Sequence, residues 1–133
     1  MATRTESQDP SAAGIDERDP VDALELLLDG QIAAAKSVQS SLPAIAKLAE
    51  AAAATIRNGG RLFYAAAGSS GLMALADALE IPGTFGISRE RVIILFAGGQ
   101  AALSDMVGGV EDDADQARID VLSHNIAAGD LLI

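Results

Sequence analysis

Apolar residues repeat every three or four positions in the first part of the chain, which predicts amphipathic helices. The first apolar face consists of Leu24, Leu28, Ile32 and Ala35. Asp19 and Pro20 stand directly before it and suit a helix N-cap followed by the first helical position. Gly30 weakens this helix but need not end it. We therefore predict a helix that begins at Pro20.

A second helix is predicted to begin near Pro43 and to end at Asn58-Gly59-Gly60, whose residues tolerate the left-handed conformation. Its apolar face consists of Ile45, Leu48, Ala49, Ala52 and Ile56. We expect the two helices to pack as a helical hairpin over residues 19–59. Residues 1–18 are mostly polar, and we expect them to form a disordered N-terminal tail.

After residue 60 the pattern changes to short apolar runs that alternate with stretches of helical spacing. The runs predict buried parallel strands at Arg61–Ala66 and Arg91–Phe96 and the opening of a third strand at Gly129–Ile133. Helices are expected at about 72–79, 100–107 and 112–126. This alternation predicts an α/β domain over 60–133, with a parallel sheet flanked by helices in three layers and right-handed crossovers. The third strand has no helix after it, so we expect a chain truncated in mid-domain.

Composition and charge narrow the range of partners. Half of the 133 residues are apolar, enough for one small domain with a buried core. The net charge of −10 argues against nucleic acid and anionic membranes, but backbone N–H groups can still hold a small phosphorylated ligand. With no cysteine and one histidine, we expect no metal site. No secretory leader or membrane-length apolar run is visible, so we expect a cytoplasmic protein.

The segment Ala67–Gly71 lies between a predicted strand and a predicted helix. Its glycines allow a ligand to approach the backbone, and Ser69 and Ser70 add hydroxyl donors. The unpaired N–H groups at a helix start favour an anion, so the segment is a candidate phosphate loop. It lacks the lysine of a Walker A loop and the glycine spacing of a dinucleotide turn. The alternative is an ordinary strand-to-helix turn with serine as N-cap.

Two acidic segments are further candidates. Glu80 is expected near a helix C-terminus, because Pro82 and Gly83 should end that helix. The helix dipole disfavours a carboxylate there, which hints at another role, although a solvated surface glutamate is the alternative. Glu111 lies in an acidic run that suits a helix start or a weak divalent-ion site, without the features of an EF-hand. His124 is interpreted as a surface histidine.

In their order along the chain these segments resemble the N-acetylmuramic acid 6-phosphate etherases, a family of the SIS (sugar isomerase) superfamily. The family's blocks are approximately GRLIY, GAGTSGR, DASECPPTFG, AGG and GAED. Their counterparts here are Gly60–Tyr64, Ala67–Gly71, Asp77–Gly86, Ala97–Gly99 and Val110–Asp113. The resemblance covers roughly residues 43–133 and implies a SIS-type fold for the sheet domain.

The resemblance also implies a carbon-oxygen lyase that cleaves the D-lactyl ether of N-acetylmuramic acid 6-phosphate during peptidoglycan recycling, without metal or cofactor. Glu80 matches the acid that protonates the departing ether oxygen, and Glu111 matches the base that removes the proton at sugar C2. The phosphate-binding residues would be Gly68, Ser69, Ser70 and Gly71. We expect both carboxylates to face one pocket beside the two serines. The resemblance further implies a homodimer.

The chain departs from the family at several positions. Leu72 replaces an arginine, Ile81-Pro82-Gly83 replaces Cys-Pro-Pro, and Gly108 replaces a glutamate. A second serine-rich sugar loop and a C-terminal helical region are absent from the sequence. One alternative is a phosphosugar-binding regulatory module without catalysis. Another is a phosphosugar isomerase, which would need a base but not the segment around Glu80.

Overall fold

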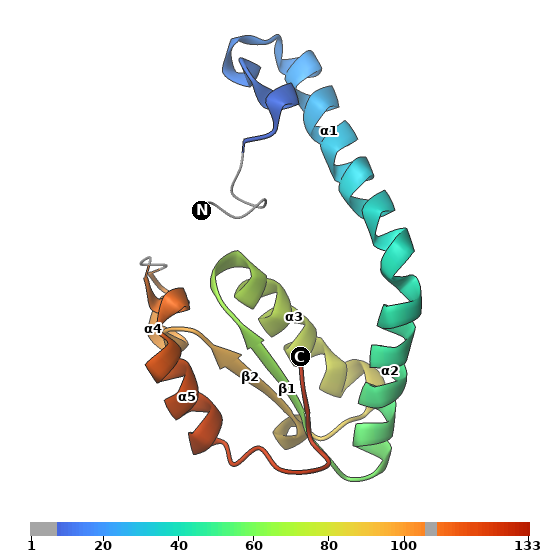
Figure 1. The fold of residues 1–133 in the computed structure, drawn as a ribbon, viewed down its shortest axis with the longest axis vertical. Coiled ribbons are helices and arrows are strands. Elements are labelled where there is room, and N and C mark those ends of the chain that lie inside the picture. Colours follow the sequence, from blue (N-terminus) through green and yellow to red (C-terminus); the bar gives the residue numbers. More distant parts are fainter. Residues whose placement is uncertain (1–7, 106–108) are drawn as a thin grey trace. The chain divides into compact units, whose positions relative to one another are not determined.

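The computed structural model describes residues 8–105 and 109–133, which form two compact units divided between Ala46 and Lys47 (Figure 1). The elements that begin in the first unit are η2 (Pro10–Ala12), η3 (Ile15–Glu17), α1 (Pro20–Ser37), η4 (Val38–Ser41) and α2 (Leu42–Arg57). α2 continues into the second unit. The tail predicted over 1–18 falls partly on residues 1–7, which lie outside the described residues. Its disorder and the hairpin over 19–59 remain predictions.

The start of α1 is the one that the sequence predicts. Pro20 is its first residue, and the Asp19 side chain accepts a hydrogen bond of 3.0 Å from the Val21 N–H. Gly30 lies inside the helix without ending it. Local chemistry alone therefore determines this helix start.

The second unit is a mixed α/β structure built on a parallel sheet. Its strands are β1 (Leu62–Ala66), β2 (Val92–Phe96) and β3 (Leu131–Leu132), in the order β2-β1-β3. Leu62 of the central strand pairs with Val92 on one side and Leu131 on the other. The other elements of this unit are α3 (Gly68–Phe85), η5 (Arg89–Arg91), α4 (Gly99–Ala102), η6 (Val110–Asp112) and α5 (Ala114–Ser123). The predicted parallel sheet flanked by helices is confirmed.

The strand order determines where the helices lie. Right-handed crossovers from β1 to β2 and from β2 back to β3 put α3 and α5 on opposite faces of the sheet. Figure 1 shows β1 and β2 side by side between these two helices. The buried apolar residues are Leu62, Phe63, Ala78, Leu95, Phe96 and Ala102. The core therefore lies along β1 and β2 and beneath α3.

Three predicted helix boundaries are wrong. α3 does not end at Pro82 but continues to Phe85, and Gly86 with φ of +65° is its C-cap. Proline removes one hydrogen bond to the preceding turn, and one further turn can follow before the left-handed glycine stops the helix. α4 ends at Ala102 rather than near 107, and residues 106–108, including Gly108, lie outside the described residues. α5 ends at Ser123, two residues before Asn125 with φ of +47°.

Arg61 connects three segments at the beginning of β1. Its guanidinium lies 2.7 Å from the Asp130 carboxylate. The backbone N–H of Arg61 also donates a hydrogen bond to that carboxylate, at 2.8 Å. The guanidinium also donates to the carbonyl oxygens of His124 and Asn125, at 3.2 and 2.8 Å. Its carbon lies 4.8 Å from the centre of the Phe63 ring. One cation therefore satisfies carbonyl groups at the end of α5 and holds the turn before β3.

Tyr64 connects β1 to α3. Its hydroxyl donates a hydrogen bond of 2.6 Å to the Asp77 carboxylate. Burial and, next, the bond to Asp77 raise the pKa of Tyr64 to about 12. Removing the phenolic proton would leave two anions in contact, so the neutral phenol holds the strand and the helix together.

Gly71 is buried in the first turn of α3, directly against a core aromatic ring. A Cβ at this position would lie 2.6 Å from a carbon of the Phe96 ring, closer than van der Waals contact allows. Glycine is therefore required here for packing, because no side chain fits between α3 and β2.

We predict that the Arg61–Asp130 ion pair loses its contribution to stability in acid. The Arg61 side chain, with the amides of Ala127 and Arg61, lowers the pKa of Asp130 from 3.8 to about 2. This stabilisation is complete above the unfolded pKa and is lost as the pH falls from about 4 towards 2. Urea unfolding measures the free energy of unfolding of the wild type and of Asp130→Asn. The difference between the two should be constant near neutral pH and should disappear as the pH falls from about 4 towards 2.

The control for this prediction is Asp115→Asn, which breaks an exposed pair with Arg118 at 2.9 Å. Both of those side chains are more than three-quarters exposed, so this substitution should change the free energy of unfolding by less than about 1 kcal/mol. A gap between wild type and Asp130→Asn that persists unchanged at pH 2 would contradict the assigned role of Asp130.

We predict that Tyr64 ionises far above the ordinary range and that Asp77 contributes to this shift. The chain has one tyrosine and no tryptophan, so phenolate absorbance in an alkaline titration reports Tyr64 alone. The midpoint should lie near 12 in the wild type and lower in Asp77→Asn. Equal midpoints in the two proteins would show that Asp77 does not contribute.

We predict that Gly71→Ala destabilises the protein by about 1–3 kcal/mol through overpacking against Phe96. Gly83→Ala is the matched control on the same helix, because a Cβ there would meet nothing within 4 Å. That substitution should be neutral or stabilising by up to about 1 kcal/mol. Chemical denaturation measures both, and adding Phe96→Leu should recover part of the loss in Gly71→Ala. Similar effects at the two glycines would rule out the steric explanation.

Candidate active site

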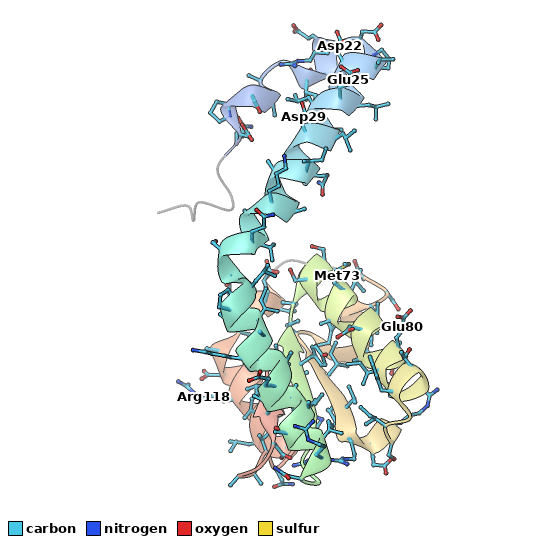
Figure 2. All side chains as sticks on the ribbon, turned by 90° about the vertical axis from the view of Figure 1, so that its right-hand side faces the viewer. Asp22, Glu25, Asp29, Met73, Glu80 and Arg118 are labelled. Carbon is cyan, nitrogen blue, oxygen red and sulfur yellow. The ribbon has the colours of Figure 1, made fainter. Side chains whose placement is uncertain are left out.

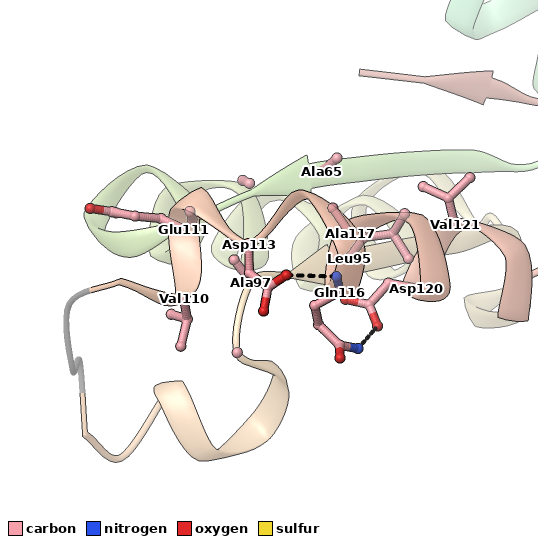
Figure 3. Close-up of a pocket in the computed structure, with 13 residues that line it drawn as sticks. Ala65, Leu95, Ala97, Val110, Glu111, Asp113, Gln116, Ala117, Asp120 and Val121 are labelled. Atoms are coloured by element: carbon pink, nitrogen blue, oxygen red, sulfur yellow. Dashed lines mark hydrogen bonds between the residues drawn. The ribbon is translucent and has the colours of Figure 1, made fainter.

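A pocket of about 310 Å³ lies at the carboxyl ends of β1 and β2, beneath the first part of α5 (Figure 3). Ligands of open α/β sheets bind outside the carboxyl ends of the strands, and small-molecule pockets have this order of volume. The strand side of the pocket is lined by Ala65, Ala66, Ala67, Leu95, Ala97 and Gly98. The opposite side is lined by Val110, Glu111, Asp113, Gln116, Ala117, Asp120 and Val121. All the polar side chains of the lining therefore come from η6, the residue after it and α5.

The predicted phosphate loop is the start of α3. The N-cap is Ala67, whose side chain accepts no hydrogen bond, so the alternative of a serine N-cap is wrong. Gly68 is the first helical residue and has φ of +54°, a conformation that glycine adopts without strain. The first bond within the turn runs from the Gly71 N–H to the Ala67 carbonyl at 2.8 Å. The amides before Gly71 have no acceptor within the helix, so this helix start can hold an anion.

The two serines of this loop are exposed and are not part of the pocket lining, although Ala67 is. The structure therefore does not bring the side chains of Ser69 and Ser70 into the lined volume.

Glu111 lies where the structure brings η6 against the start of α3. Its Oε2 is 3.4 Å from the position that a Cβ on Gly68 would occupy. In Figure 3 its side chain extends from η6 towards the loop that follows β1. The structure therefore brings together Glu111 and the candidate phosphate loop.

Glu80 does not share this pocket. It is exposed on α3 and points outward, as does Met73 on the same helix (Figure 2). It follows Gly68 by more than three turns, a distance of about 18 Å along the helix. Two carboxylates facing one pocket beside Ser69 and Ser70 are therefore not found within a single chain. The reason is that α3 is one continuous helix, which carries Glu80 away from the pocket of its own chain.

Sequence reasoning missed the polar face of α5. The Asp113 carboxylate accepts a hydrogen bond of 2.8 Å from the Gln116 N–H and caps the helix. The Gln116 side-chain amide then donates to the Asp120 carboxylate at 2.8 Å. The spacing of 113, 116 and 120 places all three on one helix face, which could have been recognised as a candidate lining.

The remaining candidates have structural explanations. His124 is the half-buried C-cap of α5, and its ring meets the Phe63 ring edge-on at 6.3 Å between centres. Within residues 8–105 and 109–133, no three or more His, Cys, Asp or Glu side chains are grouped so that they could hold a metal ion. In the same residues, no helix is both long and apolar enough to cross a membrane.

Comparisons with known proteins bear on the predicted resemblance. No protein-family model matches the chain. Among curated proteins, the chain is 36% identical over 129 residues to the N-acetylmuramic acid 6-phosphate etherase of Serratia proteamaculans, an alignment that covers 97% of this chain and 43% of that protein. It is 39% identical over 130 residues to the etherase of Cutibacterium acnes, with 94% and 43% covered. For the etherase of Deinococcus radiodurans the identity is 38%, with 98% and 43% covered.

The chain thus spans less than half the length of the curated relatives that it matches. The aligned part nevertheless includes nearly all of its residues, from the helical segments to the last strand. The expected resemblance is confirmed: this chain is related, over nearly its whole length, to the N-acetylmuramic acid 6-phosphate etherases.

Proposed function

We propose that this chain carries the catalytic base and the phosphate loop of a SIS-type etherase, which releases D-lactate from N-acetylmuramic acid 6-phosphate in the cytoplasm. The observation that carries this proposal is the position of Glu111 beside the start of α3, in a pocket at the carboxyl ends of the strands. The relatives are named for this activity, which supports the same reaction class. The other product is N-acetylglucosamine 6-phosphate, as amino-sugar recycling requires.

The phosphate of the substrate binds at the start of α3. The free amides after Ala67 donate to its oxygens, and the exposed hydroxyls of Ser69 and Ser70 are further donors in the same turn. These are local interactions, so they are compatible with a net charge of −10. Leu72 stands where the family has an arginine, so the phosphate site relies on backbone dipoles more than on a cation.

Glu111 acts as the general base. The aldehyde of the open-chain sugar makes the hydrogen at C2 acidic, and the Glu111 carboxylate removes it. The released electron pair forms the C2–C3 double bond while the C3–O bond to lactate breaks. A proton from the acid neutralises the departing oxygen, and water then adds across the double bond. No metal or cofactor takes part in these steps.

Glu80 acts as the acid from a second copy of the chain. Its carboxylate lies outside the pocket of its own chain, and the SIS enzymes that this chain resembles build sites across a subunit interface. A homodimer of this kind would bring Glu80 of one copy to the pocket that contains Glu111 of the other. Its exposed position on α3 leaves the side chain available for that contact.

The alternative is a regulatory module that binds a phosphosugar without converting it. Leu72 in place of the family's arginine and the absence of Glu80 from the pocket favour this alternative. The carboxylate of Glu111 at the phosphate loop favours the enzyme, because binding alone does not require an anion beside a bound phosphate.

We predict that D-lactate release by the full-length protein falls by about 10²–10⁴-fold in both Glu111→Gln and Glu80→Gln, because each removes a proton-transferring group. Glu90→Gln changes an exposed glutamate outside the pocket lining and should leave the rate unaltered. Mixing the two inactive variants should restore about a quarter of wild-type activity if Glu80 acts across a dimer, since half of the dimers then contain one intact site.

If the mixture of the two variants recovers no activity, Glu80 does not act from a second copy of the chain. Phosphosugar binding without lactate release by the full-length wild type would overturn the enzyme and leave the regulatory module.

A further inference from the structure

The two sides of the pocket differ in chemistry, and this difference limits how a ligand is recognised. On the strand side every lining side chain is alanine, leucine or the hydrogen of glycine, so that side offers no side-chain hydrogen bond. Selection between sugars therefore depends on the residues of η6 and α5. Glu111 is the base of the proposed reaction, and the Asp113 carboxylate is engaged by the helix cap. Gln116 and Asp120 are the polar side chains of this lining that are left to recognise the sugar.

Gln116 and Asp120 are already joined to each other. The amide nitrogen of Gln116 donates to Oδ1 of Asp120 at 2.8 Å, and Figure 3 shows both side chains in the lining near Leu95. This bond uses one N–H of the Gln116 amide. The amide oxygen of Gln116 and the second oxygen of Asp120 remain as acceptors, and the other amide N–H remains as a donor. Groups that donate, such as sugar hydroxyls, match such a surface. Asp120 is half-buried, and a ligand donor that reaches its second oxygen would add to the bond from Gln116.

The spacing along α5 fits a monosaccharide. Asp113 begins the polar face next to η6, and Asp120 is about 10 Å further along the helix axis. A hexose phosphate with its phosphate at the start of α3 would extend over a similar distance. Its hydroxyl-bearing edge would lie along α5.

We propose that Gln116 and Asp120 determine the sugar specificity of this pocket, by accepting hydrogen bonds from the hydroxyls of the bound phosphosugar and by repelling a second anionic group. The inference rests on the proposed function, whose substrate class it makes more specific. Together with Glu111 and Asp113, Asp120 makes the α5 side of the pocket anionic. The lactyl carboxylate of the substrate therefore points away from α5, and its hydroxyls face that helix.

The test is calorimetric titration of the full-length protein with three probes: inorganic phosphate, N-acetylglucosamine 6-phosphate and fructose 1,6-bisphosphate. Gln116→Leu and Asp120→Asn should each weaken binding of the sugar monophosphate by about tenfold, because each removes an acceptor for a hydroxyl. Neither should change the affinity for inorganic phosphate. Asp120→Asn should strengthen binding of the bisphosphate relative to the monophosphate, an opposite change that loss of folding would not produce.

Asp115→Asn is the matched control on α5, because Asp115 is exposed and absent from the lining. It should leave all three affinities as they are. Equal losses for inorganic phosphate and the sugar monophosphate, or unchanged affinities in both pocket variants, would overturn the inference. If the wild type binds the sugar monophosphate through Gln116 and Asp120 and yet releases no lactate, that result would support the inference and reject the proposed etherase. A wild type that binds none of the probes would overturn both.

Discussion

The position of β1 between the two other strands is the constraint on which the second unit depends. Leu62 and Phe63 are 5% and 0% exposed, so the first half of the strand is buried and cannot shift its register without exposing them. Its carboxyl end is followed by the start of α3, and Arg61 directly precedes its amino end. The candidate site and the main polar anchor of the fold are therefore at opposite ends of this central strand.

Arg61 transmits this constraint to α5. Its bonds to the carbonyls of His124 and Asn125 hold the last turn of that helix, while Asp130 holds the guanidinium. Two polar residues of the pocket lining, Gln116 and Asp120, belong to the same helix, more than one turn before its end. The placement of Gln116 and Asp120 against the strand ends thus depends on an ion pair that has no part in the proposed chemistry.

Two glycines at the start of α3 have different neighbours. The Glu111 carboxylate lies at ordinary van der Waals distance from the position of a Cβ at Gly68, whereas the Phe96 ring packs where a Cβ at Gly71 would stand. The same short turn therefore contacts a candidate catalytic group and the core. The proposed base and the anion-binding helix start are therefore neighbours, so one bound sugar phosphate could reach both.

By itself, the sequence determined the features that depend on neighbouring residues. The cap at Asp19, the buried strand before Ala67 and the alternation of strands and helices were all predictable, because each follows from local hydrogen bonding or from hydrophobic spacing. Motif similarity also indicated the family and named Glu111. Pro82 was the local signal that misled, since a helix can continue for one turn beyond a proline when a left-handed glycine follows.

Only the tertiary structure decided which of the candidate residues meet. Gln116 and Asp120 join Glu111 at the pocket because the chain crosses back over β1 to form β3, which places α5 against the strand ends. Glu80 lies outside the pocket because each residue of α3 rises along the helix axis, so that Glu80 is far from the helix start. Arg61 and Asp130 are paired across 69 positions, a contact that no local pattern encodes. Such contacts depend on strand order and crossover handedness, which arise from packing of the whole domain.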